Sequence, residues 1–216
     1  MDAAGERTRF VIKPVSATNA WGVMGLEKLD VSRWRDVLTG QVHTVGDILI
    51  LLDEPMQRYN FPDKWLLEEL LTPPSGQAGV LEEFKVYGFR GRCPLVLQVR
   101  GMRDGRGYKW WTADWTPVTT GKYVDRTDPD LQPPECASEL VALAEQVSSH
   151  IPASFCRIDM FVTDTGVRLS ELTPEPGAYH DFSVETDRLL GVYWEQAETR
   201  LMTDMKPADL PWTPKT

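Results

Sequence analysis

The stretch that decides the fold reads Phe-Cys-Arg-Ile-Asp-Met-Phe-Val-Thr-Asp-Thr-Gly-Val-Arg-Leu-Ser-Glu-Leu-Thr-Pro-Glu-Pro-Gly, from Phe155 to Gly177. Residues 155–162 form one β-prone run and residues 167–172 form a second. Between them, Thr163-Asp164-Thr165-Gly166 has the composition of a turn. This pattern predicts an antiparallel β-hairpin.

Three charged residues lie within these apolar strands, namely Arg157, Asp159 and Glu171. A buried charge is costly unless it has a partner, so they need one another or a ligand. A hairpin with one acid on each strand can direct both carboxylates at a single hard cation, as in sites for Mg²⁺ and its phosphates. The alternative is a surface hairpin whose charges are solvated, and agreement from other parts of the chain has to decide between the two.

Composition and charge limit the function classes. The chain has 216 residues, of which 42% are hydrophobic and 25% charged, as in ordinary globular proteins with a sizeable core. A net charge of −9 argues against nucleic acid and anionic membranes as partners, since both would be repelled. No apolar run is long enough to insert in a membrane, and the N-terminus does not resemble a signal peptide. The three scattered cysteines are typical of a reducing compartment, so we expect a cytoplasmic protein.

The N-terminal part resembles a flap over a ligand. A short strand, residues 10–14, contains Lys13 and is followed by the small and polar residues 15–22 and a second strand, residues 23–29. Backbone N–H groups and hydroxyls in such a loop suit phosphate oxygens, and Lys13 would add a point charge. The alternative is an ordinary hairpin with a surface lysine.

Residues 65–71 predict a strand that runs into the Pro-rich segment 72–76, as a hinge between two lobes would. Its backbone could pair with an adenine edge, leaving Glu68 and Glu69 for adenine N6 or the ribose. An edge strand with its charges on the wet face explains the same residues.

The other elements follow from hydrophobic periodicity. Helices are expected over residues 30–38, 44–52 with Thr44 as N-cap, 137–150, and from residue 185 or 186 onward. Strands are expected over residues 81–89, 93–99 and 108–115, with an irregular acidic linker over 122–134. His180, in a loop after the hairpin, is a candidate acid–base group or an ordinary loop histidine.

These pieces together resemble the ATP-grasp superfamily, and within it the teichuronopeptide-biosynthesis type, from about Phe10 to Glu195. Residues 83–91 are similar to the family strand Asp-Tyr-Lys-x-x-x-Phe-x-Gly. Arg157-Ile158-Asp159 and Glu171-Leu172-Thr173-Pro174 resemble its Arg-Val-Asp and Glu-Leu-Thr signatures. Two features depart from the family: residues 16–21 replace its glycine-rich loop, and only about nine residues precede the lysine strand, where relatives usually have an N-terminal domain.

The resemblance implies an α+β ATP-grasp fold whose two subdomains, each with an antiparallel sheet and helices, grip Mg-ATP between them. The expected bounds are 1–71 for the first subdomain and hinge, 72–204 for the second, and 205–216 for a flexible tail. The resemblance implies Mg²⁺ ligation by Asp159, Glu171 and Thr173, and catalytic roles for Arg157 and Lys85. The residues expected to bind ATP are Lys13, Ser16, Thr18, Asn19, Gly22, Glu68, Glu69, Leu70 and Leu71.

The chemistry that the resemblance implies is ligation, in which a carboxylate takes the γ-phosphoryl group of ATP and an amine attacks the acylphosphate. Small-molecule carboxylate and amine substrates are therefore expected, and a homodimer is attractive as a way to complete the pocket. Two alternatives stay open: a kinase that phosphorylates a small-molecule hydroxyl, and a nucleotide-binding module without turnover.

Overall fold

The structure is a computed structural model that describes residues 8–16, 21–60, 62–74, 81–101 and 105–204. The chain divides into two compact units. The first comprises residues 1–81 with 102–105, and the second comprises residues 82–101 with 106–216. The unit boundary therefore lies at Leu81, ten residues after the expected end of the first subdomain at Leu71. The expected tail, residues 205–216, lies outside the described residues.

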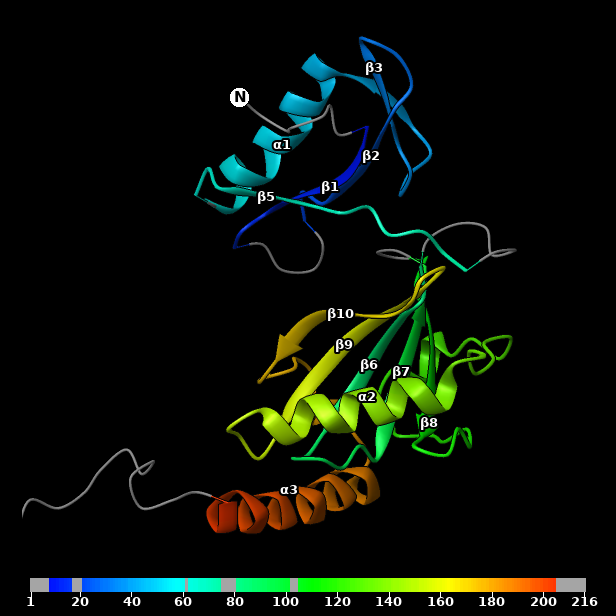
Figure 1. Ribbon diagram of the computed structural model, residues 1–216, viewed down its shortest axis with the longest axis vertical. Helices are drawn as coiled ribbons and strands as arrows, with labels where there is room; N and C mark the ends of the chain where they lie inside the picture. Colours follow the sequence, from blue (N-terminus) through cyan, green and yellow to red (C-terminus); the bar gives the residue numbers. More distant parts are fainter. Residues whose placement is uncertain (1–7, 17–20, 61, 75–80, 102–104, 205–216) are drawn as a thin grey trace, which may run out of the picture. The chain divides into compact units, whose positions relative to one another are not determined.

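The first unit is an antiparallel sheet covered by one helix (Figure 1). The strand order is β4 (Val42–Thr44), β3 (Arg33–Asp36), β2 (Met24–Lys28), β1 (Arg9–Pro14) and β5 (Trp65–Glu68). Helix α1 (Val45–Tyr59) packs on one face through Ile48 and Leu52, which join Met24 and Leu26 in a small core. Alternate β1 residues Phe10 and Ile12 pack against this core, so Val11 and Lys13 lie on the opposite face of the sheet.

Helix α1 begins as the sequence predicts. The Thr44 hydroxyl accepts a hydrogen bond from the backbone N–H of Asp47, and the Asp47 carboxylate accepts one from the backbone N–H of Thr44. This reciprocal arrangement satisfies two N–H groups that the helix itself cannot pair. The helix continues past Leu52, its expected end, to Tyr59.

The helix expected over residues 30–38 is wrong, because this segment contains a turn and strand β3. Asp30 accepts hydrogen bonds from the backbone N–H groups of Ser32 and Arg33, which turns the chain back on β2. Trp34 packs edge-on against Phe10 at 5.4 Å. The helical spacing of three apolar residues stabilises this segment less than the turn held by the Asp30 side chain and the pairing with β2 do.

The second unit is also built on an antiparallel sheet (Figure 1). Its strand order is β10 (Gly166–Thr173), β9 (Cys156–Thr163), β6 (Glu83–Gly88), β7 (Leu95–Arg100) and β8 (Gly107–Thr112). Its helices are α2 (Ala137–His150) and α3 (Val184–Asp204). The bounds of α2 are those expected from its sequence, and β9 and β10 are the predicted hairpin.

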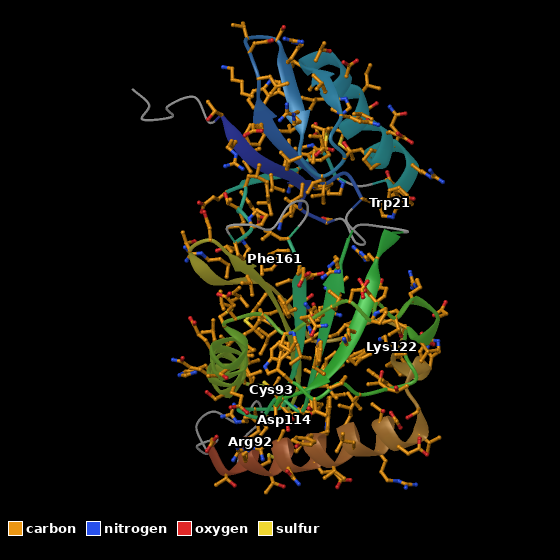
Figure 2. All side chains as sticks on the ribbon, turned by 90° about the vertical axis from the view of Figure 1, so that its right-hand side faces the viewer. Trp21, Arg92, Cys93, Asp114, Lys122 and Phe161 are labelled. Carbon is orange, nitrogen blue, oxygen red and sulfur yellow. The ribbon has the colours of Figure 1, made fainter. Side chains whose placement is uncertain are left out.

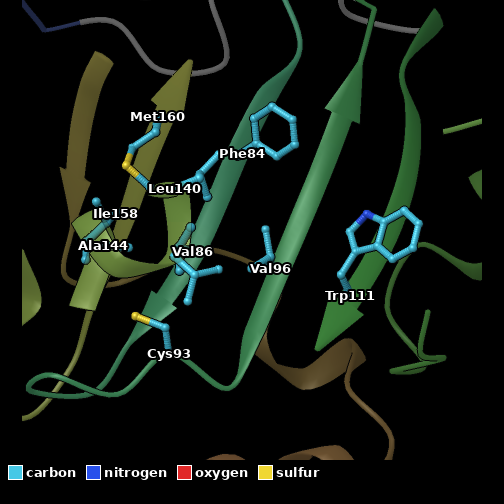
Figure 3. Close-up of a cluster of buried hydrophobic side chains, with 10 residues drawn as sticks. Phe84, Val86, Cys93, Val96, Trp111, Leu140, Ala144, Ile158 and Met160 are labelled. Carbon is cyan, nitrogen blue, oxygen red and sulfur yellow. The ribbon is translucent and has the colours of Figure 1, made fainter. Parts of the chain in front are cut away.

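Each face of this sheet has its own core. On one face, Leu140 and Ala144 of α2 pack on Val86, Ile158 and their neighbours, which Figure 3 shows in close-up. On the other face, Ala197 of α3 belongs to a cluster rich in aromatic residues with Tyr87 and Trp110. Both faces are therefore buried over most of the sheet, and polar residues between these cores need specific partners. The expected α+β fold with two antiparallel sheets is confirmed.

Candidate functional site

Strand register places the predicted catalytic and metal residues in two adjacent rows across the second unit's sheet. Lys85 of β6, Asp159 of β9 and Glu171 of β10 are direct cross-strand partners. In the next row, Arg157 lies between Tyr87 and Thr173. Directly opposed residues of paired strands project to the same face, so both rows share the face that carries the α3 core.

Asp159 is the centre of an ion-pair network. Its carboxylate is fully buried and accepts hydrogen bonds from Arg157 Nε at 2.6 Å, Arg157 Nη2 at 2.7 Å and Lys85 Nζ at 2.7 Å. Lys85 Nζ also lies 2.7 Å from Glu83 Oε1, and Arg157 Nη2 donates to the Thr173 hydroxyl at 3.0 Å. A buried carboxylate is tolerated because two cations contact it with charge-assisted hydrogen bonds.

The electrostatics of Arg157 follow from this contact. Burial alone would lower the pKa of its guanidinium, but the hydrogen bonds and negative charge of Asp159 outweigh burial and raise it. Burial also raises the pKa of the Tyr87 hydroxyl beside it. Arg157 is thus a permanent cation that is held in place by Asp159 and Thr173.

Glu171 is in the opposite situation to Asp159, although the two face each other. Its side chain is exposed on edge strand β10, and within the described part of the chain no hydrogen bond or ion pair involves it. The ladder shifts register between Leu169 and Glu171, which is the mark of a β-bulge just before the acid. Glu171 can therefore take up a ligand without breaking an existing contact.

The donor set fits magnesium in its chemistry. Asp159, Glu171 and Thr173 offer oxygen atoms only, which suits a hard cation that keeps water and phosphate oxygens as further ligands. The described residues contain no cluster of three or more His, Cys, Asp or Glu side chains arranged for a metal. Two carboxylates and one hydroxyl would thus leave most coordination positions to phosphate and water. For a metal to bind Asp159, Lys85 or Arg157 would have to give up part of its present contact.

Glu83 belongs to the same network, and the sequence analysis did not single it out. It lies two residues before Lys85 in β6, on the same face, and its carboxylate shares the Lys85 ammonium with Asp159. The alternation of polar and apolar residues along β6 was the available signal. Only the pairing of β6 with β9 shows which acid Lys85 approaches.

In the first unit, Lys13 and Glu68 contact each other. Lys13 Nζ lies 2.7 Å from Glu68 Oε2 across the β1–β5 pair, on the sheet face opposite α1. About a third of the Lys13 side chain and half of the Glu68 side chain are exposed, so water screens this pair. Two residues expected to bind nucleotide are thus adjacent and accessible.

The remaining residues expected to bind nucleotide lie in turns, in irregular backbone or outside the described residues. Ser16 lies in an exposed turn after β1, and Gly22 has a φ of +71°, with Pro14 Cγ 3.0 Å from where an added Cβ would lie. Thr18 and Asn19 lie outside the described residues. Strand β5 ends at Glu68, so Glu69, Leu70 and Leu71 follow it as irregular backbone, with Leu70 close to Gly25.

His180 does not join either row. It lies in a short 3₁₀ turn, η3 (Tyr179–Asp181), with most of its side chain exposed and Asp181 as its ion-pair neighbour at 3.3 Å. The position fits an ordinary loop histidine.

The first unit also has a cavity of about 360 Å³. Part of its wall is aromatic: Trp21 lies 5.2 Å from Tyr59, and the Arg58 guanidinium lies over both rings. Residues of the β3–β4 region, including Asp36 and His43, line it as well. Of the predicted site residues that the structure describes, Gly22 alone contributes to it.

The face with the two rows can therefore supply cations for a polyanion and oxygen donors for a hard metal. Lys85 and Arg157 can stabilise charge on a transferring phosphoryl group, and Glu171 offers an open carboxylate. No helix in the described part of the chain combines the length and apolar character needed to cross a membrane.

Comparison with protein families matches residues 1–195 to the family described as TupA-like ATPgrasp. None of the curated proteins matches the sequence. Among solved structures, the chain is similar to D-alanine–D-alanine ligase from Bacillus anthracis complexed with ATP, with 15% identity and a TM-score of 0.46 over 92% of this chain and 54% of that one.

D-Alanine–D-alanine ligase from Helicobacter pylori gives 16% identity and a TM-score of 0.42 over 99% of this chain and 49% of that one. The ATP-grasp ligase PsnB, complexed with a phosphomimetic variant of its minimal precursor, Mg and ADP, gives 14% identity and a TM-score of 0.40. The match covers 89% of this chain and 46% of that one. The chain thus spans about half the length of the solved structures it matches.

Proposed function

Since the chain belongs to the TupA-like ATP-grasp family, we propose that it is an ATP- and Mg²⁺-dependent ligase that joins a carboxylate to an amine. The observation that carries the proposal is the cross-strand row Lys85–Asp159–Glu171 with Arg157 beside it. One face of one sheet holds two cations and two carboxylates where a triphosphate, its metal and a second anion would have to meet.

The chemical problem is repulsion between two anions. A carboxylate oxygen must attack the γ-phosphorus of ATP, with the bond from phosphorus to the β–γ bridging oxygen breaking and ADP leaving. Magnesium, when bound, would neutralise part of the phosphate charge. In this proposal Asp159, Glu171 and Thr173 hold the metal, and the cationic side chains of Lys85 and Arg157 stabilise the negative charge of the transferring group.

The second step needs no enzyme nucleophile. The nitrogen of the amine attacks the acyl carbon, the bond between that carbon and the phosphate oxygen breaks, and phosphate leaves with the charge it carries. The amine proton passes to solvent or to phosphate. Arg157 is suited to both steps because its guanidinium stays charged and its planar fork binds two oxygens at once.

Residues of the first unit would contribute to nucleotide binding. Lys13 would contact phosphate, together with the loop residues Ser16, Thr18, Asn19 and Gly22. Glu68 and the backbone of residues 69–71 would meet the adenosine part. Because Glu68 pairs with Lys13 at 2.7 Å, nucleotide binding would separate the two side chains or bridge them.

Two alternatives remain. A kinase would use the same ATP residues and pass the phosphoryl group to a hydroxyl, giving a stable phosphorylated product. A nucleotide-binding module without turnover is favoured by one observation: both carboxylate oxygens of Asp159 are already occupied by Arg157 and Lys85.

The test is ATP turnover by the purified chain with panels of amino acids, sugar acids and amines, followed by mass analysis of the products. Asp159→Asn and Glu171→Gln should each lower turnover by about 10²-fold or more, since each removes charge that the transition state needs. Asp164→Asn is the matched control, because Asp164 is exposed in the turn of the same hairpin.

Phosphate release that requires both an acid and an amine supports the ligase. A phosphorylated alcohol identifies the kinase, and Mg-ATP binding without turnover under any acceptor identifies the binding module. If both site variants keep wild-type turnover, the metal-site assignment is wrong.

A further inference from the structure

Lys122 is a buried lysine that the proposed chemistry does not use. It lies in the segment between β8 and α2, beside the sheet of the second unit (Figure 2), and only 2% of its surface is exposed. The sequence analysis placed it in an irregular acidic linker. Lysine is almost never fully buried without a partner, so the groups around its ammonium must stabilise it.

The ammonium group contacts a carbonyl and two aromatic rings. Lys122 Nζ donates to the backbone carbonyl of Gly177 at 2.7 Å, and it lies 5.3 Å from the Tyr123 ring and 5.0 Å from the Phe182 ring. Among the described residues, no carboxylate lies within ion-pair distance of it. The bond to Gly177 is therefore its one strong polar contact in the described chain.

The backbone on either side of Lys122 is tied to the same region. The Thr120 carbonyl accepts a hydrogen bond from the Ser183 N–H at 2.7 Å. Gly121, with a φ of +89°, lies so close that an added Cβ would be 2.6 Å from the Ser183 nitrogen. On the other side, Trp110 of β8 donates its indole N–H to the Lys122 carbonyl at 3.0 Å. Residues 120–122 thus join β8 to the segment 177–183.

That segment connects the candidate metal site to α3. It begins four residues after Thr173, the last residue of β10. It ends at Ser183, and the Ser183 hydroxyl accepts a hydrogen bond from the Thr186 N–H at the start of α3. Of the described strands, β10 pairs only with β9 at the edge of the sheet, and a bulge precedes Glu171. An edge strand is paired on one side, and a bulge disrupts its ladder locally, so a contact just beyond its end adds a further constraint.

We propose that Lys122 is a positioning residue, whose bond to the Gly177 carbonyl holds the exit of β10 and keeps Glu171 and Thr173 opposite Asp159 and Arg157. The metal part of this inference rests on the proposed function, whereas the anchoring part does not. The expected consequence of removing the ammonium is a looser segment 174–183 and weaker binding of a metal–nucleotide pair, with the core of the sheet intact.

The chain offers a close control in Lys109. Its Nζ donates to the carbonyls of Pro129 and Leu131 at 2.9 and 2.7 Å and lies 4.6 Å from the Trp111 ring. Lys109 pairs with Gln98 in the β7–β8 ladder, so it projects to the α2 face and not to the face of the candidate site. Lys109→Met therefore removes the same kind of contact from the face of the sheet that does not carry the candidate site.

The experiment measures two properties of Lys122→Met, Lys122→Arg and Lys109→Met. Amide hydrogen exchange followed by mass spectrometry reports opening of residues 174–183. Electron paramagnetic resonance of Mn²⁺ with ADP reports metal–nucleotide affinity without requiring turnover. Lys122→Met should exchange faster over 174–183 and bind Mn²⁺-ADP several-fold more weakly, Lys122→Arg should recover part of both, and Lys109→Met should change neither.

Unchanged exchange over 174–183 in Lys122→Met overturns the anchoring. Faster exchange with unchanged Mn²⁺-ADP affinity overturns the positioning role and leaves Lys122 as a structural residue. If the wild-type chain binds no Mn²⁺-ADP, the proposed function fails and takes the positioning role with it, while exchange still decides the anchoring. Should Lys122→Met not fold, Lys122→Gln, which replaces the ammonium with a neutral amide on a shorter side chain, is measured with the same expected results.

Discussion

Asp159 and Glu171 are direct partners across the β9–β10 hairpin, yet one carboxylate is fully buried against two cations and the other is exposed without a partner among the described residues. The buried acid organises Lys85 and Arg157, while the exposed acid is free to meet a ligand. The two acids therefore differ in burial and in existing contacts, so their substitution should affect stability differently.

Asp159→Asn should destabilise the second unit strongly, and Glu171→Gln should not. Removing the Asp159 charge leaves the mostly buried Arg157 without its counter-charge and leaves Lys85 with Glu83 alone, which costs about 3–5 kcal/mol. An exposed side chain such as Glu171 changes stability by about 0.5 kcal/mol or less. Urea denaturation of the variants measures this difference, and equal destabilisation by the two would contradict the assigned roles.

Arg157→Lys should keep the fold but lower ATP turnover by about 10²-fold. A lysine retains the charge and loses the paired hydrogen bonds to Asp159 and the bond to Thr173. Steady-state kinetics checks this, with Arg168→Lys as control because Arg168 is exposed on β10 and its side chain bonds only Thr165 among the described residues. Turnover within a factor of about three of wild type would remove Arg157 from the transition state.

The stability contribution of Lys122 should depend on pH in a defined direction. Burial lowers the pKa of Lys122 to about 8 from 10.5; the charge of Asp181 opposes this shift and that of Arg157 adds to it. Between these two values the unfolded chain binds more protons than the folded one, so this group makes the protein more stable as pH rises from about 8 to 10.5.

Burial also raises the pKa values of Tyr87, Tyr123 and Cys93. Because these groups make the protein less stable at high pH, the effect of Lys122 is measured as the difference between variant and wild type. The free energy of unfolding of Lys122→Met minus that of wild type should fall as pH rises from 8 to 10.5. Denaturant titrations at several pH values measure it. A difference that stays constant or rises over this range would show that Lys122 is not a desolvated amine.

Thr44→Ala should destabilise the first unit by about 1 kcal/mol, the usual value for an N-cap. The Thr44 hydroxyl is half of a capping box with Asp47 at the start of α1. Thr199→Ala is the control, because within the described ranges the Thr199 hydroxyl bonds only the Glu195 carbonyl one turn earlier in α3. Chemical denaturation followed by circular dichroism measures both, and a loss no larger than that of the control would exclude the cap as a stabilising contact.

The local pattern of the chain was enough for several elements. The β-prone runs 155–162 and 167–172 with a turn at 163–166 predict the hairpin, and the spacing of Leu140, Val141 and Ala144 predicts α2 with its observed bounds. Thr44 is recognisable as an N-cap. In these places the residues that decide the conformation are close neighbours in sequence, so their periodicity contains the answer.

Elsewhere the sequence pattern predicted the wrong element or made no prediction. Residues 30–38 have helical spacing, but the Asp30 turn and pairing with β2 make β3. The pairing of Lys85 with Asp159, which are 74 residues apart, follows from the β6–β9 register, and so does the inclusion of Glu83.

The charged residues and their order along the chain, which identify the family, were therefore determined by the sequence itself. Which acid is buried, which is open and how Lys122 reaches Gly177 were decided only by tertiary structure. The physical reason is that burial and long-range strand pairing depend on segments far apart in the chain, and these leave no trace in local periodicity.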